Sequence, residues 1–236
     1  MKSLIVARRF CGPPTSANGG YFAGLVAAFA PPTQVLSVRL KAPPPLDTEL
    51  WVGEIADGGI EVRDGARLIG SGSPAVLDLH SPPPVEYAEA AEASRHYVGL
   101  ANARFPTCFV CGAKRSQGDG LCIFAGAVGG RDIVAAPWTP DASLDRGDGT
   151  VRSEFVSAAL DCPGYFAVTP DARLMLLAQF TVQLHRPVRV GERCTVIGWC
   201  ISSNGPKHTA GTALHGSDGE LCGRASALWV EPRTTG

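Results

Sequence analysis

The stretch LSVRLKAP at residues 36–43 returns as FTVQLHRP at residues 180–187, 144 positions later in a chain of 236 residues. Each copy alternates apolar and polar residues and then meets a proline and a polar turn. Each continues in another strand-like run, LWV at 50–52 or CTVI at 194–197. A single repeat of this length indicates a duplicated domain, because solenoid repeats have periods of about 20–50 residues. Differences between the copies are therefore the place to look for chemistry.

The composition excludes several classes of protein. Hydrophobic residues make up 45% and charged residues 18%, which is enough for a sizeable core. A net charge of −1 offers no basic field for nucleic acid or an anionic membrane, so we expect neither partner. No apolar stretch has the length of a signal peptide or a membrane span. The eight cysteines are scattered, often in strand-like runs, and we expect a cytoplasmic protein with reduced thiols.

Each copy predicts a strand, a helix and an antiparallel meander. A proline-rich linker at 81–84 and a connecting helix at 86–97 separate the copies, which predicts domains at 1–100 and 101–236. The expected helices cover 18–29 and 151–168, and the expected strands cover 3–9, 34–42, 48–56, 59–63, 67–79, 120–127, 131–137, 173–186, 192–201, 207–215 and 220–231. One helix per copy must cover one sheet face, so we expect an α+β fold in which a curved antiparallel sheet wraps around a single helix, twice.

These features resemble the double-hotdog acyl-CoA thioesterases. The stretch GPPTSANGGYFAGL at 12–25 is similar to the first helix of that family, where a Gly-Gly pair opens the helix, usually after His; here Asn18 takes the place of His. The stretch AALDCPG at 158–164 resembles the helix of single-hotdog thioesterases, which carries an acidic residue after an apolar run. The resemblance implies a tandem hotdog fold and a site between paired units.

Asp161 is the sharpest catalytic candidate. It follows the apolar run FVSAAL at 155–160, on a helix that we expect the sheet to enclose. Burying an unpaired carboxylate is costly, so it needs a partner or a raised pKa. Such a group can activate water or attack a thioester directly. The alternative is structural, because Pro163 suits the first turn of a helix and Asp161 could cap a second helical segment that begins near Cys162.

The motif Asn18-Gly19-Gly20 is the second candidate. A helix N-terminus exposes unpaired N–H groups, and glycines let a ligand approach the backbone closely. These donors could stabilise the oxyanion of a thioester under attack. The alternative is an Asn cap with glycines that serve packing.

The two candidates lie in different copies. The first helix carries no acidic residue and the second lacks a Gly-Gly pair, which favours one composite site over two equal ones. Glu154 is a rival carboxylate, but an acid in a first helical turn is explained by the helix dipole.

Further residues are candidates for substrate binding. Phe22, Leu25 and Phe155 could line an acyl pocket or be core, and Lys207 and His208 could attract the phosphates of coenzyme A or be surface charges.

The motif Cys108-Phe-Val-Cys111 has the spacing of half a zinc site. Structural zinc needs four ligands, and only Cys122 is nearby, so we expect a turn without metal and no cofactor.

The resulting hypothesis is a hydrolase of acyl-CoA or acyl-carrier thioesters whose composite site lies between the two halves. The alternative is a protein that binds acyl groups or coenzyme A without catalysis. We expect a small-molecule acyl thioester as partner, and leftover sheet edges allow a homodimer.

Overall fold

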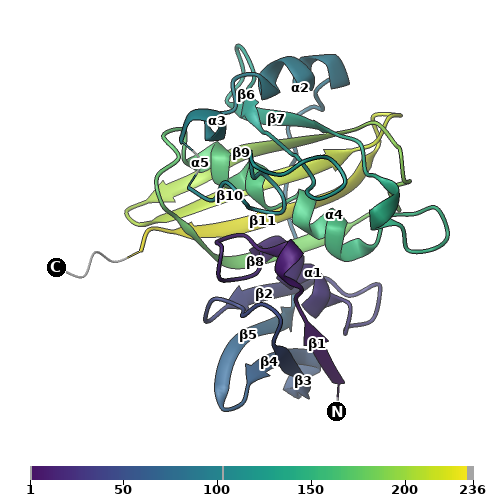
Figure 1. The fold of residues 1–236 in the computed structure, drawn as a ribbon, viewed down its shortest axis with the longest axis vertical. Coiled ribbons are helices and arrows are strands. Elements are labelled where there is room, and N and C mark those ends of the chain that lie inside the picture. The colour runs from purple at the N-terminus through teal and green to yellow at the C-terminus, as the bar shows by residue number, and fades with distance from the viewer. Residues whose placement is uncertain (1, 103, 233–236) are drawn as a thin grey trace.

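The computed structural model describes residues 2–102 and 104–232. Over these residues the strands form one eleven-stranded antiparallel sheet in the order β1-β3-β4-β5-β2-β8-β11-β10-β9-β7-β6 (Figure 1). The strands are β1 (Lys2–Ile5), β2 (Leu36–Leu40), β3 (Glu49–Ile55), β4 (Gly59–Asp64), β5 (Arg67–Pro74), β6 (Gly126–Ala127), β7 (Ile133–Trp138), β8 (Leu176–Leu184), β9 (Cys194–Asn204), β10 (Lys207–His215) and β11 (Leu221–Val230). The helices are α1 (Gly19–Ala27), α2 (Tyr87–Ser94), α3 (Gly99–Asn102), α4 (Ser153–Ala159) and α5 (Cys162–Val168), with short 3₁₀ turns at Arg8–Phe10, Ala56–Gly58 and Ala142–Leu144.

The two repeated stretches lie side by side at the centre of the sheet. Strand β2 pairs antiparallel with β8, so that Ser37 lies opposite Thr181. These two residues occupy the same position in the repeat, and the Thr181 hydroxyl donates to Ser37 Oγ at 2.9 Å. The strands of the first half therefore lie on one side of this junction and those of the second half on the other.

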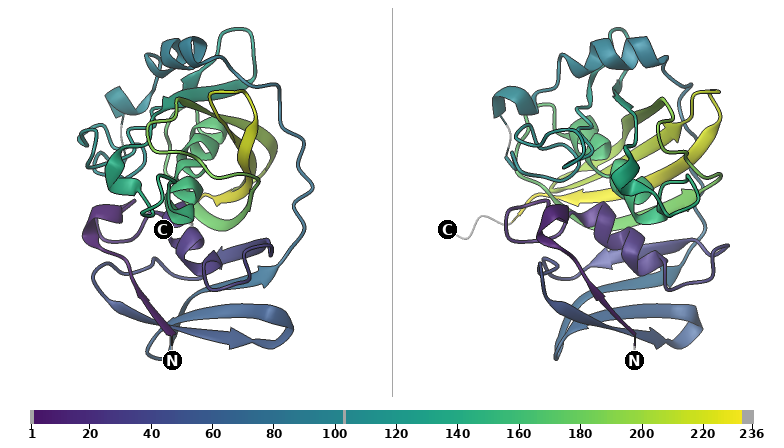
Figure 2. Two further views of the ribbon diagram at one scale, coloured as in Figure 1. Left: turned by 90° about the vertical axis from the view of Figure 1, so that its right-hand side faces the viewer. Right: turned by 45° about the vertical axis from the view of Figure 1, so that its right-hand side comes forward.

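Helices α1 and α4 pack against each other on the concave side of the sheet (Figure 2). The approach is close because two glycines face α4: a Cβ on Gly20 would lie 2.9 Å from Ser157 O, and one on Gly24 would lie 2.6 Å from Glu154 Cα. Ser157 Oγ donates to Gly20 O at 2.8 Å. This contact fixes how far α1 can slide along α4.

The helix expected at 151–168 is broken into α4 and α5. Pro163 stands in the first turn of α5, where it cannot donate a helical hydrogen bond. The break frees the Leu160 carbonyl, which accepts a hydrogen bond from Thr212 Oγ1 of β10 at 2.8 Å. Asp161 lies at the break itself, with φ −79° and ψ −71°.

The other expected elements are present, but their ends differ: the strand expected at 120–127 is reduced to β6, its last two residues, and β9 extends to Asn204. Residues 3–9 form β1 followed by a 3₁₀ turn instead of one strand, and the connecting helix spans α2. Helix α2 covers the opposite sheet face over a second, smaller core of Leu79, Ala90, Ala93, Ile133 and Trp199. The division into domains at 1–100 and 101–236 stays a prediction. No helix within the described ranges is both long and apolar enough to cross a membrane.

Candidate active site

The Asp161 side chain bridges the two halves of the chain. Its Oδ2 accepts a hydrogen bond from Asn18 Nδ2 at 2.8 Å and another from the Gly20 backbone N–H at 2.9 Å. The donors come from the start of α1, and the acceptor comes from the break between α4 and α5. A Cβ on Gly20 would lie 2.5 Å from Asp161 Cβ, so only glycine permits this approach.

Asn18 does two things with one side chain. Its Oδ1 accepts from the Tyr21 N–H at 2.9 Å and so caps α1, while its Nδ2 donates to Asp161. An Asp or Ser cap would satisfy the helix equally well, but neither could supply this amide donor. The cap suggested for Asn18 by the sequence is therefore present in the structure.

Asp161 does not cap α5. Among the described residues, its side chain makes no capping hydrogen bond, although it occupies the position before the helix. The side chain points across to α1 instead. Its position is therefore set by the partner half of the chain.

Burial raises the pKa of Asp161 to about 7. The hydrogen bond from Gly20 opposes this rise, the nearby Cys108 adds to it, and the hydrogen bond from Asn18 opposes it again. Desolvation is the largest cause because Asp161 is only 2% exposed. The carboxyl group thus changes charge near neutral pH, where a general base is most effective.

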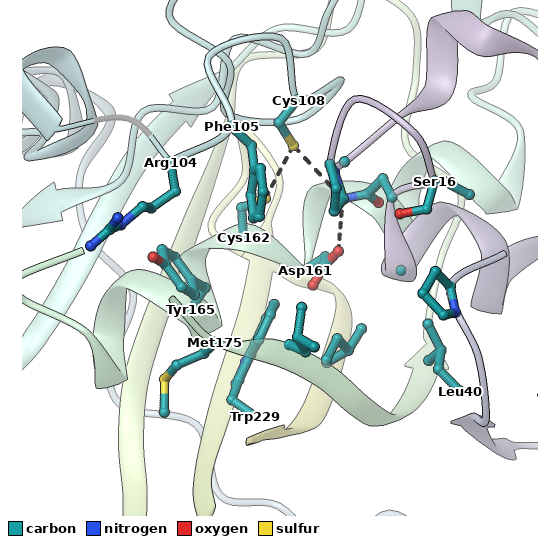
Figure 3. A pocket seen from close by; sticks show the side chains of 18 of the residues that line it. Ser16, Leu40, Arg104, Phe105, Cys108, Asp161, Cys162, Tyr165, Met175 and Trp229 are labelled. Atoms are coloured by element: carbon teal, nitrogen blue, oxygen red, sulfur yellow. Dashed lines mark hydrogen bonds between the residues drawn. The ribbon is translucent and has the colours of Figure 1, made fainter. Parts of the chain in front are cut away.

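One carboxylate oxygen remains available. Asp161 Oδ1 is buried and has no hydrogen-bond partner in residues 2–102 and 104–232. Asp161 lines a cavity of about 520 Å³ whose walls are largely apolar and include Leu40, Phe105, Met175 and Trp229 (Figure 3). This volume lies in the range of small-molecule sites. An apolar cavity with a buried carboxylate at its wall is suited to a ligand with an apolar tail and one polar reacting group.

The helix-start motif is only partly free to bind a ligand. The Gly20 N–H and the Asn18 amide are engaged by Asp161, whereas Gly19 lines the cavity beside them. In this arrangement Asn18 and Gly20 position the acid. Their role toward an oxyanion stays a prediction.

The other predicted residues lie elsewhere. Phe22 and Phe155 are fully buried core residues and Leu25 is packed against the same core, and the cavity lining includes none of them. Lys207 and His208 begin β10 and are also absent from the lining; His208 Nε2 lies 3.3 Å from Glu231.

Glu154, the rival acid, is paired with Arg152 at 3.4 Å in the first turn of α4. That pairing accounts for it without a role at the cavity, whose lining does not include Glu154.

Two exposed cations at the cavity were missed. Lys41 follows β2, and Arg104 lies between α3 and Cys108, where its Nε donates to Ala172 O at 3.2 Å. Nothing in the local sequence marks either residue, because only the fold brings residues 41 and 104 to the same cavity.

Three cysteines meet next to the acid. The sulfurs of Cys108, Cys111 and Cys162 all lie within 4.8 Å of one another, and Cys108 Sγ is 4.0 Å from Asn18 Nδ2. The sequence suggested Cys122 as the neighbour of the CxxC pair, but Cys122 lies apart, with its sulfur 3.7 Å from Arg115 O. No disulfide joins the cysteines of the described chain.

Solved structures resemble this arrangement over almost the whole chain. The TesB protein of Mycobacterium avium subspecies paratuberculosis is 14% identical, with a TM-score of 0.61 over 92% of this chain and 88% of that one. A proposed thioesterase II from Thermobifida fusca is 14% identical, with a TM-score of 0.61 over 98% and 92%. The chain has the fold of thioesterase II and TesB-like proteins. The resemblance noted from the sequence is confirmed at this level.

Other comparisons add little to this TesB-like fold. A thioesterase superfamily protein is 21% identical over 48% of this chain, with a TM-score of 0.44, and the match spans about half of that protein, 55% of its length. No model of a protein family and no curated protein matches the sequence.

Proposed function

We propose that the protein hydrolyses acyl thioesters, with Asp161 as general base, at one composite site between two fused hotdog units. The observation that carries the proposal is the Asp161 carboxylate: buried at an apolar cavity, held through Oδ2 by the other half of the chain, and unpartnered at Oδ1. The thioesterases with the same fold support the reaction class.

The duplication is supported by the central junction. Equivalent residues Ser37 and Thr181 face each other across β2 and β8, and α1 and α4 pack together beside them. The second end of the helix pair lacks the same groups: α4 is preceded by Arg152, which makes no capping bond within the described chain, and α1 ends in Ala27. We therefore place the catalytic groups at one end of the helix pair, where α1 begins.

The reaction follows from this geometry. Asp161 Oδ1 removes a proton from water while the water oxygen bonds to the thioester carbonyl carbon. The tetrahedral intermediate then expels the sulfur, the C–S bond breaks, and the proton passes from Asp161 to the leaving thiolate. Asn18 and Gly20 keep the carboxylate oriented through the cycle, and the apolar walls hold the acyl chain.

The charged residues that line the cavity favour coenzyme A as the thiol part of the substrate. Lys41 and Arg104 place positive charge at the edge of the cavity, where the phosphates of a coenzyme A moiety would lie. Alanine at both positions should raise KM for acyl-CoA several-fold with little change in kcat. It should not affect the matched N-acetylcysteamine thioester, which has no phosphate. Lys207→Ala, outside the cavity, is the control; a KM effect there and none at the rim would support the residues suggested by the sequence instead.

A test of the function compares turnover with binding. Wild-type protein is assayed for thiol release from acyl-CoAs of increasing chain length, and binding of the same compounds is measured by calorimetry. Release of free thiol with multiple turnovers supports the hydrolase. Single-turnover hydrolysis in H₂¹⁸O should label the released acid, and label found in Asp161 would mean nucleophilic attack by the carboxylate in place of general base catalysis.

Binding without cleavage is the second candidate. The observation that favours it is the engagement of Asn18 and the Gly20 N–H by Asp161, which leaves fewer donors for an oxyanion. Micromolar binding of acyl-CoA with no thiol release would establish this alternative.

The unpaired thiols of the described chain agree with a cytoplasmic location, which remains part of the proposal.

A further inference from the structure

The three-cysteine cluster is built from two separate segments of chain. Cys108 and Cys111 come from the turn after residue 104, and Cys162 is the first residue of α5. All three are buried, with exposures of 2%, 9% and 6%. Buried cysteines elsewhere, such as Cys194 and Cys222, belong to no such group within the described residues. Ordinary apolar packing of cysteine explains those, but it does not explain three converging thiols.

The turn that carries two of the sulfurs is tightly held. The Gly112 N–H donates to Cys108 O at 2.9 Å, and a Cβ on Gly112 would lie 2.5 Å from that oxygen, so the turn requires glycine. The Tyr97 hydroxyl donates to Cys111 O at 2.7 Å, and the Phe109 N–H donates to Cys11 O at 2.7 Å. The sulfurs are therefore fixed by the backbone before any ligand arrives.

The spacing of the sulfurs matches a metal ion. A zinc–sulfur bond is about 2.3 Å, so two thiolates of a tetrahedral site lie about 3.8 Å apart. Cys108 Sγ and Cys162 Sγ are 3.8 Å apart, and all pairs lie within 4.8 Å. A CxxC pair with a third cysteine from elsewhere in the chain is also a usual source of zinc ligands.

A polar group outside the cluster lies next to the Cys108 sulfur. Asn18 Nδ2, at 4.0 Å, is placed to support the same sulfur from outside the ligand set.

We propose that Cys108, Cys111 and Cys162 bind one Zn²⁺ as thiolates and leave its fourth coordination position open to the cavity. All three residues line the same cavity as Asp161, so a water molecule or a ligand atom from the cavity completes the tetrahedron. Structural zinc sites use four protein ligands, whereas three protein ligands and an exchangeable fourth are typical of catalytic sites. Each thiol releases its proton to solvent as the zinc–sulfur bond forms. The sequence predicted no metal here because it offered Cys122, and not Cys162, as the third ligand.

The test uses the full chain, reduced and stripped of metal by a chelator. Titration with Co²⁺ should give one equivalent bound, with a thiolate-to-cobalt charge-transfer band and the visible bands of a tetrahedral ion, and Zn²⁺ should displace it. X-ray absorption of the zinc form should show three sulfurs at about 2.3 Å and one lighter atom at about 2.0–2.2 Å.

Variants locate the site. Cys162→Ser and Cys111→Ser should each weaken Zn²⁺ binding by more than about 100-fold, beyond what loss of an outer hydrogen-bond partner causes. Cys222→Ser, a buried cysteine outside the cluster, should bind as wild type does. If a ligand variant fails to fold, the wild-type stoichiometry and absorption spectra still decide.

Failure to bind Zn²⁺ at one equivalent, binding of Cu(I) but not Zn²⁺, or binding untouched by Cys162→Ser would each overturn the proposal. The readout is metal binding, so its outcome is independent of whether the protein hydrolyses thioesters.

Discussion

Replacing Asn18 by alanine should move the pKa of the carboxyl group opposite it. The Asn18 amide donates to Asp161 Oδ2 at 2.8 Å in a buried site, and this bond favours the charged carboxylate. A hydrogen bond to a charged group contributes about 1.5–3 kcal/mol. Since one pH unit corresponds to about 1.4 kcal/mol, Asn18→Ala should raise the pKa of Asp161 by about one to two pH units.

The rate should follow this change. Wild-type Asp161, with a pKa of about 7, is about half ionised at pH 7. The variant would be about 1–10% ionised at that pH, so kcat/KM at pH 7 should fall about 5- to 50-fold and recover as the pH is raised. The assay is the pH profile of kcat/KM on a thioester substrate. An independent readout is the NMR titration of ¹³C-labelled aspartate carboxyl groups, which needs no turnover.

Ser157→Ala is the matched control. It removes another buried hydrogen bond between α4 and α1, from Ser157 Oγ to Gly20 O, without removing a donor to Asp161. It should lower stability and leave the pKa of Asp161 near its wild-type value. An Asn18→Ala variant whose profile coincides with that of wild type, or moves to lower pH, would refute the assigned role of the amide.

Three further predictions concern stability, each read as the free energy of unfolding in urea. The pKa of Asp161 is higher in the folded chain than in the unfolded one, so its contribution to the free energy of unfolding is full below about pH 4 and is lost as the pH rises through about 7. The wild-type free energy of unfolding should therefore decline by about 4 kcal/mol over that window, and Asp161→Asn should remove the decline. A variant whose free energy of unfolding has the same pH dependence as wild type would contradict this. Gly20→Ala should cost about 1–3 kcal/mol because its Cβ would overlap α4, whereas Gly53→Ala, with nothing within 4 Å, should not; equal losses would speak against the close helix contact. Thr212→Val should cost about 1–3 kcal/mol by leaving Leu160 O unpaired, and a neutral result would mean the broken helix satisfies that carbonyl otherwise.

The sequence predicted the order of elements well because alternation and turn residues are local signals. The repeat at 36–43 and 180–187 became the adjacent strands β2 and β8, and the expected strand at 207–215 matches β10. The break at Pro163 was also visible locally. Whether the helix would continue past it was not, because the Leu160 carbonyl is satisfied by Thr212, 52 residues away.

The site was predicted in part for the same reason. Asp161 and the Asn18-Gly19-Gly20 motif stand out because a carboxylate after an apolar run and paired glycines at a helix start are unusual in one sequence. That the donors would bind the acid itself depends on the helix crossing, which no local pattern encodes.

The residues that line the cavity could be identified only from the fold. Lys41 and the Cys162 sulfur gain their neighbours only from tertiary structure, so the sequence pointed to Lys207 and Cys122 instead.

The most direct test of the central claim compares two carboxylates. Asp161→Asn keeps the shape and an acceptor for the α1 donors but cannot act as a base, and it should lower kcat/KM by about 10²–10⁴-fold. Glu154→Gln removes the rival acid, paired with Arg152, and should stay within about twofold of wild type. A folded Asp161→Asn protein with wild-type activity, or a Glu154→Gln protein without activity, would contradict the account.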